Sequence, residues 1–391
     1  AAGTLTKSGV GALTLSGANT YTGVSNVNAG TIIVGNVNAL GTTAAGTTVA
    51  SGARITFNAL ATNSTVAEAF TISGTGTTAN NGALNMGGGL KTVNLTGAIT
   101  LSGNALVTAD GDAALNFTGA SGISGTNTNL SFNTDGSVAS SITGPIALGT
   151  GSLTKTSTST LILSGNNTYS GGTALAGGVI QANHNNALGT GSVVITGTRL
   201  SVGSGINIAN AITINANTGS SGRGLLEASA GTAILSGPIA INNGPPAGGL
   251  LGSVGTAVLD IQGVITSSVQ VSQRIGTVKF TGGGTGYTAM IATGTTIVGA
   301  NDGSATTALV TLGGSANSTL DLNGFNQSLA GIARNANTVV IGNSSTTSDS
   351  ILTTTGTSSY SGSIVDVVSP GTRKVGLTVA SGQLTLTGTN T

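Results

Sequence analysis

The sequence predicts an all-β fold, a parallel β-solenoid in which successive turns of the chain stack on one another. Apolar and polar residues alternate in short runs such as GALTLSG, GTIIVG and SVVITG, which is the pattern of half-buried β-strands. These runs recur roughly every 8 to 13 residues between Gly, Asn, Ser or Asp turns, and no convincing amphipathic helix is present. Sandwiches and barrels share this strand spacing, but long internal repeats favour a solenoid.

The repeats are long and specific. Residues 3–42 and 151–190 align without a gap, and residues 376–391 repeat only the opening of the same phrase. The two full copies share G-x-L-T-K, then L-x-L-S-G-x-N-T-Y-x-G, then N-A-L-G-T. In each copy, Leu and Ile should point inward and Thr and Ser outward, while Gly and Asn form the turns. One unit cannot bury its apolar face alone, so we expect a single continuous solenoid over residues 1–391.

Solenoid geometry gives an expected size. At roughly 20 residues per turn the chain makes roughly 20 rungs, and a spacing of about 4.8 Å gives a rod about 90 Å long. The Asn-rich stretches 81–89, 183–189 and 215–222 are expected to supply turns where Asn side chains stack in ladders. Rows of Thr are expected on the outer faces.

Composition favours an exported structural protein. Charged residues make up 5% of the chain and the net charge is +1, with no Cys. The absence of Cys excludes disulfides and Cys-based metal sites. Because the sequence has no basic patch and no apolar run of about 18 residues, we expect neither a nucleic-acid partner nor a membrane span. A chain rich in Thr, Ser, Asn and Gly fits an extracellular or bacterial cell-surface protein better than a cytosolic enzyme.

The repeat phrase resembles the autotransporter-associated β-strand repeat, also called the passenger-associated transport repeat. The residues that carry the resemblance are G-x-L-T-K, L-x-L-S-G-x-N-T-Y-x-G and N-A-L-G in the two full copies, and LDLNGFNQSLAGI (320–332) resembles a second phrase of such passengers. The resemblance implies a right-handed parallel β-helix outside the cell, in the passenger region of a type V secreted protein or in a large bacterial surface protein.

Residues that could carry chemistry are few. His184 is the single histidine, in a segment that matches Gly35-Asn36-Val37-Asn38 of the first repeat, so a surface turn residue is favoured over a general base or metal ligand. Asp110 and Asp112 are weak candidates for a Ca²⁺ site, but the further oxygen donors of a calcium loop are missing and a polar turn is favoured. The other acids are dispersed, so we expect no catalytic residues, no resident metal and no cofactor.

The tyrosines recur with the repeat. Tyr21, Tyr169 and Tyr360 each precede Thr-Gly or Ser-Gly, whereas Tyr287 precedes Thr-Ala. Aligned on one outer face, they would form a glycan-binding stripe. The favoured interpretation is structural, with each ring closing the end of a repeat unit.

Three functions compete. The first is a non-enzymatic extracellular filament whose subunits stack head to tail, because neither end of the sequence shows a cap. The second is an autotransporter-type passenger or adhesin rod, displayed singly and binding surface glycans or neighbouring cells. The third, disfavoured, is a polysaccharide lyase or hydrolase, which needs three or more Asp, Arg or Lys side chains in one groove. The expected assembly interface consists of apolar residues of the first and last repeat copies: Leu5, Leu13, Leu15, Leu377, Val379, Leu384 and Leu386.

Overall fold

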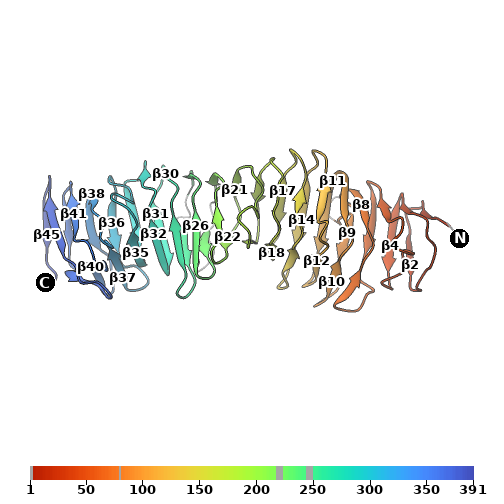
Figure 1. Cartoon of the computed structure of the whole chain (residues 1–391), viewed down its shortest axis with the longest axis horizontal. Coiled ribbons are helices and arrows are strands. Elements are labelled where there is room, and N and C mark those ends of the chain that lie inside the picture. Colours follow the sequence, from red (N-terminus) through yellow and green to blue (C-terminus); the bar gives the residue numbers. More distant parts are fainter. Residues whose placement is uncertain (1–2, 79–80, 217–222, 244–249) are drawn as a thin grey trace. The chain divides into compact units, whose positions relative to one another are not determined.

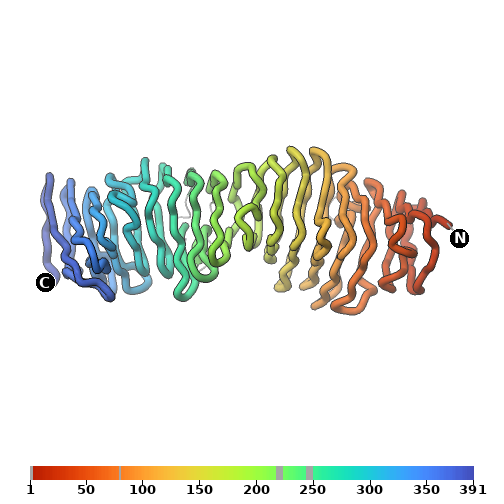
Figure 2. Tube along the Cα trace, viewed as in Figure 1, coloured from red at the N-terminus to blue at the C-terminus, as the bar shows by residue number. Residues whose placement is uncertain are grey.

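The computed structural model describes residues 3–78, 81–216, 223–243 and 250–391, and every helix or strand assigned in these ranges is a β-strand. The chain divides into two compact units, residues 1–193 and 194–391. Within each unit the strands run parallel, and each one pairs with a strand one turn further along the chain (Figure 1, Figure 2). This confirms the predicted parallel β-solenoid. A single continuous solenoid through both units stays a prediction.

Unit 1 contains three columns of stacked strands, and the long strand β11 (Ile99–Ala109) takes part in two of them. The first column contains β1 (Leu5–Lys7), β3 (Ser25–Val27), β5 (Thr47–Val49), β8 (Phe70–Gly74), β11, β13 (Ile123–Gly125) and β16 (Ile146–Ala147). The second contains β2 (Ala12–Leu15), β4 (Gly30–Val34), β6 (Ala53–Thr56), β9 (Leu84–Met86), β11, β14 (Leu130–Thr134), β17 (Leu153–Thr156) and β19 (Thr173–Leu175). The third contains β7 (Ser64–Val66), β10 (Thr92–Leu95), β12 (Ala114–Phe117), β15 (Ser140–Ile142), β18 (Thr160–Leu163) and β20 (Val179–Ala182). The strand β21 (Val193–Ile195) spans the boundary between the units.

Unit 2 is built in the same way. One set of strands contains β24 (Ile212–Ile214), β27 (Ile239–Ile241), β30 (Ile265–Ser267) and β33 (Gly284–Thr285), and a later one contains β38 (Gln327–Leu329), β41 (Ser350–Thr354) and β44 (Val375–Val379). A second column contains β22 (Arg199–Val202), β25 (Leu226–Ala228), β28 (Leu251–Ser253), β31 (Val271–Ile275), β34 (Ala289–Ala292), β36 (Leu309–Leu312) and β39 (Gly331–Arg334). The third contains β23 (Asn207–Ile208), β26 (Thr232–Leu235), β29 (Val258–Ile261), β32 (Thr277–Phe280), β35 (Gly294–Val298), β37 (Ser318–Asp321), β40 (Val339–Asn343) and β43 (Ser363–Val367). The paired strands β42 (Ser358–Tyr360) and β45 (Leu384–Leu386) follow β39, since β42 packs on β39 and the N–H of Ile332 donates to Ser358 Oγ at 3.3 Å.

The number of rungs is smaller than predicted. The solenoid makes about 16 turns rather than roughly 20. The register shows why: a turn takes 19 residues from Thr266 to Thr285, but 29 residues from Phe70 to Ile99. Loops of unequal length between strands lengthen most turns, because a solenoid fixes the stacked strands and leaves the connecting loops free to vary.

The core lies inside the coil, and it follows from alternation along each strand. In β14 and β17, Leu130 and Leu153 point inward and are buried, while the residues between inward positions face outward. Aromatic pairs reinforce the interior: Phe117 and Phe132 meet edge to face with ring centroids 5.6 Å apart. The described residues include no helix long and apolar enough to cross a membrane.

Side-chain ladders join the rungs outside the strands. Asn301 Oδ1 accepts a hydrogen bond from the backbone N–H of Asn326 at 2.8 Å, and Asn326 Oδ1 accepts one from the N–H of Ile351 at 2.8 Å. Asp321 and Asp349 accept backbone N–H groups of the next rung in the same way. Such bonds satisfy backbone donors that no strand pairs. In the predicted stretch 183–189, Asn186 Nδ2 donates to Asn166 Oδ1 of the preceding rung at 2.8 Å. Most of the stretch 215–222 lies outside the described residues.

Candidate functional site

The Asn of the N-T-Y phrase replaces a strand on one side of the repeat rung. Asn167 follows β18 and is 1% exposed. Its Oδ1 accepts the N–H of Ile146 in the preceding rung at 2.8 Å, and its Nδ2 donates to the carbonyl oxygen of Ala187 in the following rung at 2.6 Å. Asn19 makes the equivalent forward bond to the carbonyl of Ala39 at 2.7 Å. One buried amide therefore links three successive rungs, which explains why N-T-Y and N-A-L-G occur together.

The repeat tyrosines close the same junction from inside. The Tyr169 hydroxyl lies 2.6 Å from Thr173 Oγ1, and Thr173 Oγ1 donates to the carbonyl of Leu188 at 2.9 Å. The ring of Tyr169 lies against Gly189, whose φ is +69°. A Cβ on that glycine would lie 2.7 Å from the ring. In the first copy, the hydroxyl of Tyr21 lies 2.7 Å from Ser25 Oγ. Only Gly at the end of N-A-L-G therefore leaves room for the ring.

The other tyrosines are also packing residues. Tyr169 and Tyr360 are 0% exposed and Tyr287 is 1% exposed. Burial raises the pKa of Tyr287 to about 12 and that of Tyr169 still further, because the ionised phenolate would lose its hydration. No ring face at these three positions is open to a ligand, so Tyr169, Tyr287 and Tyr360 do not contribute to the glycan-binding stripe considered above, whereas Tyr21 is half-buried.

A buried lysine was missed by the sequence analysis. Lys155 is 0% exposed and points inward between Phe132 and Leu175 of the neighbouring rungs. Its Nζ donates to the carbonyl oxygens of Thr156 and, at 3.0 Å, Ser157, and burial lowers its pKa to about 8. In L-T-K, alternation places the Leu and Lys side chains on the same face of the strand. The two-residue spacing between them therefore indicates that this Lys points inward.

The acidic residues singled out from the sequence cap turns. Asp112 Oδ1 accepts the N–H of Ser137, which lowers the pKa of Asp112, and Asp110 Oδ2 accepts a bond from Asn85 Nδ2 at 3.2 Å. Burial, and then repulsion from Asp135, raise the pKa of Asp110. No group of three or more His, Cys, Asp or Glu able to hold a metal ion occurs in the described parts of the chain. Asp112 thus accepts a backbone N–H group of the next rung, and Asp110 pairs with an amide side chain.

His184 has a local role. Its Nδ1 accepts the N–H of Asn186 at 3.0 Å, and in the first repeat Asn36 Oδ1 accepts the N–H of Asn38 at 2.9 Å. The imidazole thus takes the place of an Asn side chain in the same tight turn. This is the surface-turn role that the sequence favoured.

The residues of the predicted assembly interface lie in the outermost strands. These strands are β1, β2, β44 and β45, each of which pairs with one strand on one side. Leu377 and Val379 are 38% and 46% exposed, and the other residues of the set are half-buried: Leu5, Leu13, Leu15, Leu384 and Leu386.

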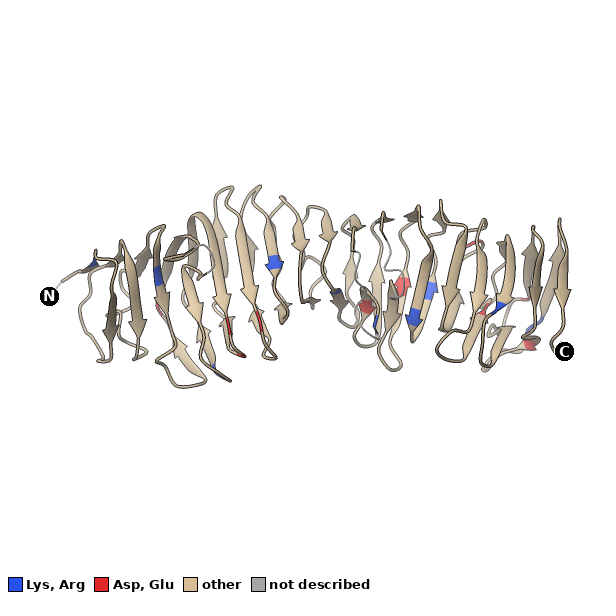
Figure 3. Ribbon diagram, turned by 180° about the vertical axis from the view of Figure 1, so that it is seen from behind, with Lys and Arg blue, Asp and Glu red and all other residues tan. Residues whose placement is uncertain are grey.

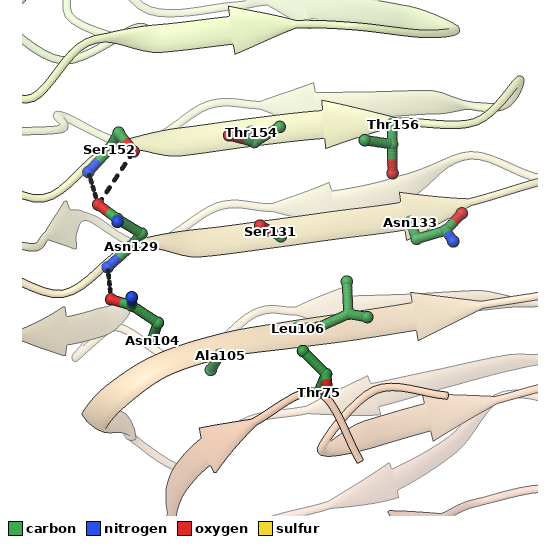
Figure 4. Close-up of a pocket in the computed structure, with 10 residues that line it drawn as sticks. All are labelled: Thr75, Asn104, Ala105, Leu106, Asn129, Ser131, Asn133, Ser152, Thr154 and Thr156. Carbon is green, nitrogen blue, oxygen red and sulfur yellow. Dashed lines mark hydrogen bonds between the residues drawn. The ribbon is translucent and has the colours of Figure 1, made fainter. Parts of the chain in front are cut away.

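One hollow on the outer face of unit 1 has the form of a ligand site. We call it the polar groove, with a volume of about 420 Å³, lined by Thr75, Asn104, Ala105, Leu106, Asn129, Ser131, Asn133, Ser152, Thr154 and Thr156. Figure 4 shows its layout over β11, β14 and β17. Asn104, Asn129 and Ser152 form one column where the strands begin, and Asn133 and Thr156 lie towards their far ends (Figure 4).

The floor between these polar side chains is shallow. Leu106, Ser131 and Thr154 are stacked partners on successive rungs, and Leu106 is only 8% exposed. Thr75, at the start of the loop that follows β8, forms part of the edge. All of the lining residues are uncharged. None of them stands out in the sequence, because they come from four separate stretches of chain.

Comparison with known proteins places the repeat in a family. The passenger-associated-transport-repeat model matches residues 5–34 and 153–182. These segments are β1 to β4 and β17 to β20, the rungs in which Asn19 and Asn167 replace a strand. Over these two segments, the chain is similar to the passenger-associated transport repeat. The resemblance noted from the sequence is therefore confirmed.

A relative supports the same assignment. Over 128 residues the chain is 36% identical to a protein named adhesin BmaC autotransporter, from Brucella suis biovar 1 (strain 1330). The match covers 30% of this chain and 4% of that much longer protein. No solved structure matches the chain significantly.

Removing the bridging amide should loosen the repeat junction. We expect Asn167→Ala to destabilise unit 1 by about 2 to 3 kcal/mol, because the buried N–H of Ile146 and carbonyl of Ala187 lose their partner. Thr168→Ala, at the exposed position next to Asn167, should cost less than about 0.5 kcal/mol. Urea unfolding of both variants compares them, and equal losses would contradict the bridging role.

The buried lysine should give stability a characteristic pH dependence. The pKa of Lys155 is about 8 in the folded state and about 10.5 when unfolded, so the unfolded chain binds the proton more tightly. Stability should therefore rise as pH increases from about 8 towards about 10.5, by at most about 1.4 kcal/mol per pH unit.

The test compares urea-unfolding midpoints between about pH 7 and pH 9, where most tyrosines of the unfolded chain remain protonated. Lys155→Met should remove the rise, whereas Lys374→Met, at an exposed position, should keep it. A rise that persists in Lys155→Met would show that another group causes it.

Proposed function

We propose that this chain is part of a non-enzymatic, adhesin-type passenger, a solenoid displayed outside a bacterial cell. The observation that carries the proposal is the pair of segments that match the transport-repeat model, the second of which contains Asn167 and Tyr169 of the rung junction. The similarity to a protein named as an autotransporter adhesin supports it. The chain spans 4% of the length of that relative. We therefore also propose, rather than observe, that this chain contributes to binding by a whole passenger.

The charge distribution supports a scaffold over an enzyme. Lys, Arg, Asp and Glu are scattered thinly over the strands and turns (Figure 3). One cluster of charges does converge: Glu227, which is 0% exposed, receives bonds from Arg223 and lies 3.8 Å from Arg199. Because its carboxylate is buried and already paired with arginine, it is not placed to act on a polysaccharide.

Surface display is tested on intact cells of the bacterium that encodes the chain. Antibodies raised against the purified chain should label unpermeabilised cells, and added protease should remove the label. The purified chain should also reduce attachment of those cells to the surface they colonise. A cytoplasmic protein serves as the control, and labelling of both proteins only after permeabilisation would contradict display.

Head-to-tail assembly is the second candidate function. The observation that favours it is the set of apolar side chains in strands paired on one side, above all Leu377 and Val379. Stacking of a second copy on β44 would cover these side chains.

Electron microscopy tests this assembly. The purified chain should form filaments, and joint replacement of Leu377 and Val379 by Asp should leave single particles with an unchanged circular dichroism spectrum. The control is Thr378→Asp, on the other face of β44, which should keep the filaments. Single particles of the unaltered chain at high concentration would exclude assembly through this interface.

A further inference from the structure

We propose that the polar groove of unit 1 binds a neutral, linear oligosaccharide. This inference rests on the proposed function, because the groove can bind an external oligosaccharide only if the chain is displayed outside the cell. The groove contains free hydrogen-bonding groups, a concave shape and no charge, and each of these properties narrows the choice of ligand.

The amide groups of the groove are held in fixed orientations. Asn129 Oδ1 accepts two bonds from Ser152, one from its N–H and one from its Oγ, both at 3.0 Å. Asn104 Oδ1 accepts the N–H of Asn129 at 2.8 Å (Figure 4). The oxygen of each amide is therefore engaged by the next rung, and its Nδ2 forms no hydrogen bond within the described part of the chain. Two exposed donors are thus oriented before any ligand arrives, which lowers the entropy cost of binding.

Two hydroxyl groups add to the hydrogen-bonding groups of the groove. Ser131 and Thr154 are half-buried on the floor, and their hydroxyls make no hydrogen bond with other described residues. A hydroxyl both donates and accepts, so it can pair with either partner that a sugar hydroxyl offers. Stacked rungs repeat these groups at about 4.8 Å along the coil, so a linear chain of similar units meets the same type of donor more than once.

Other classes of ligand fit less well. A phosphate or carboxylate would find no Lys or Arg in the lining, and a cation would find no Asp or Glu. A single-stranded nucleic acid needs aromatic stacking and positive charge, and the lining has neither. A peptide strand needs an open sheet edge, but β14 is already paired on both sides, with β11 and β17. A hydroxyl-rich, uncharged molecule fits the uncharged amide and hydroxyl groups of the lining.

Affinity at one groove should be low. Each net hydrogen bond contributes about 1 kcal/mol, and the groove offers few of them and no aromatic platform. Many copies displayed on one cell would raise the overall avidity without any further contact.

The chain offers a matched pair of variants. Asn129→Asp keeps the oxygen that accepts from Ser152 and removes the Nδ2 donor of the groove. Asn127→Asp makes the same chemical change two residues away, where Asn127 Oδ1 accepts the N–H and Oγ of Thr150 at 3.1 and 2.9 Å outside the groove. A third variant, Thr154→Trp, fills the floor, and Thr48→Trp places the same side chain at a half-buried, outward-facing position of β5.

The experiment is isothermal titration calorimetry of the whole chain with linear hexasaccharides of glucose, mannose, galactose or N-acetylglucosamine, and with hexagalacturonate as the charged counterpart. At least one neutral hexasaccharide should bind. Asn129→Asp should weaken that binding about tenfold, and Thr154→Trp should abolish it. Asn127→Asp and Thr48→Trp should leave it unchanged within about twofold.

The possible failures are distinguishable. If no neutral hexasaccharide binds, or if binding survives both groove variants, the groove is not an oligosaccharide site, even where antibodies still label intact cells. Tighter binding of hexagalacturonate than of every neutral sugar would also overturn the inference. If intact cells remain unlabelled, surface display fails whatever the calorimetry shows.

Discussion

Register between successive rungs is the constraint on which the rest of this molecule depends. Because side chains alternate across a strand, a slip of one residue would turn the inward row outward. Strand pairing sets the register along β14 and β17, but the strands are short and separated by loops. The Asn and Asp ladders extend the same register into the turns, as Asn104, Asn129 and Ser152 show. Backbone and side chain thus specify one stacking arrangement.

In the two segments that match the transport-repeat model, buried side chains also help to hold the register between rungs. Where a rung lacks its third strand, the buried side chain of Asn167 adds one hydrogen bond to the rung before and one to the rung after. These bonds lie beside the backbone bonds that the N–H groups of Thr168 and Asn167 make to the same two rungs. Tyr169 and Gly189 then fill the interior at that corner, and Lys155 binds the carbonyls of the turn after β17. Asn167 and Tyr169 lie in a segment that matches the family model, and their contacts give a structural reason for the spacing of N-T-Y.

Much of this architecture could be predicted from the sequence. Alternation in L-T-K and L-I-L gave the strands and their inward faces, and the recurrence of the phrase gave stacking. The number of rungs could not be predicted, since it depends on loops such as the one between β8 and β9, whose length follows no period. Lys155 could have been placed inside from its spacing alone, but its charge argued for the surface.

The polar groove could not be predicted from the sequence, for a different reason. Thr75, Asn104, Asn129 and Thr154 lie far apart in the chain and come together only when the register is known. Any of these residues alone resembles the many other Thr and Asn residues of an outer face. A solenoid with few charges can thus vary its surface by small changes at stacked positions, while its inward rows stay the same.

The most direct test of the register account is amide hydrogen exchange resolved to single residues in the intact chain. The N–H groups of Asn129 and Ser152 lie just before β14 and β17, and side-chain oxygens accept them. The account predicts that both exchange as slowly as the amides of the strands that follow, because the ladder opens only when the rungs separate. Exchange of both at the rate of an exposed loop, while the strands remain protected, would contradict the claim that side-chain ladders hold the rungs in register.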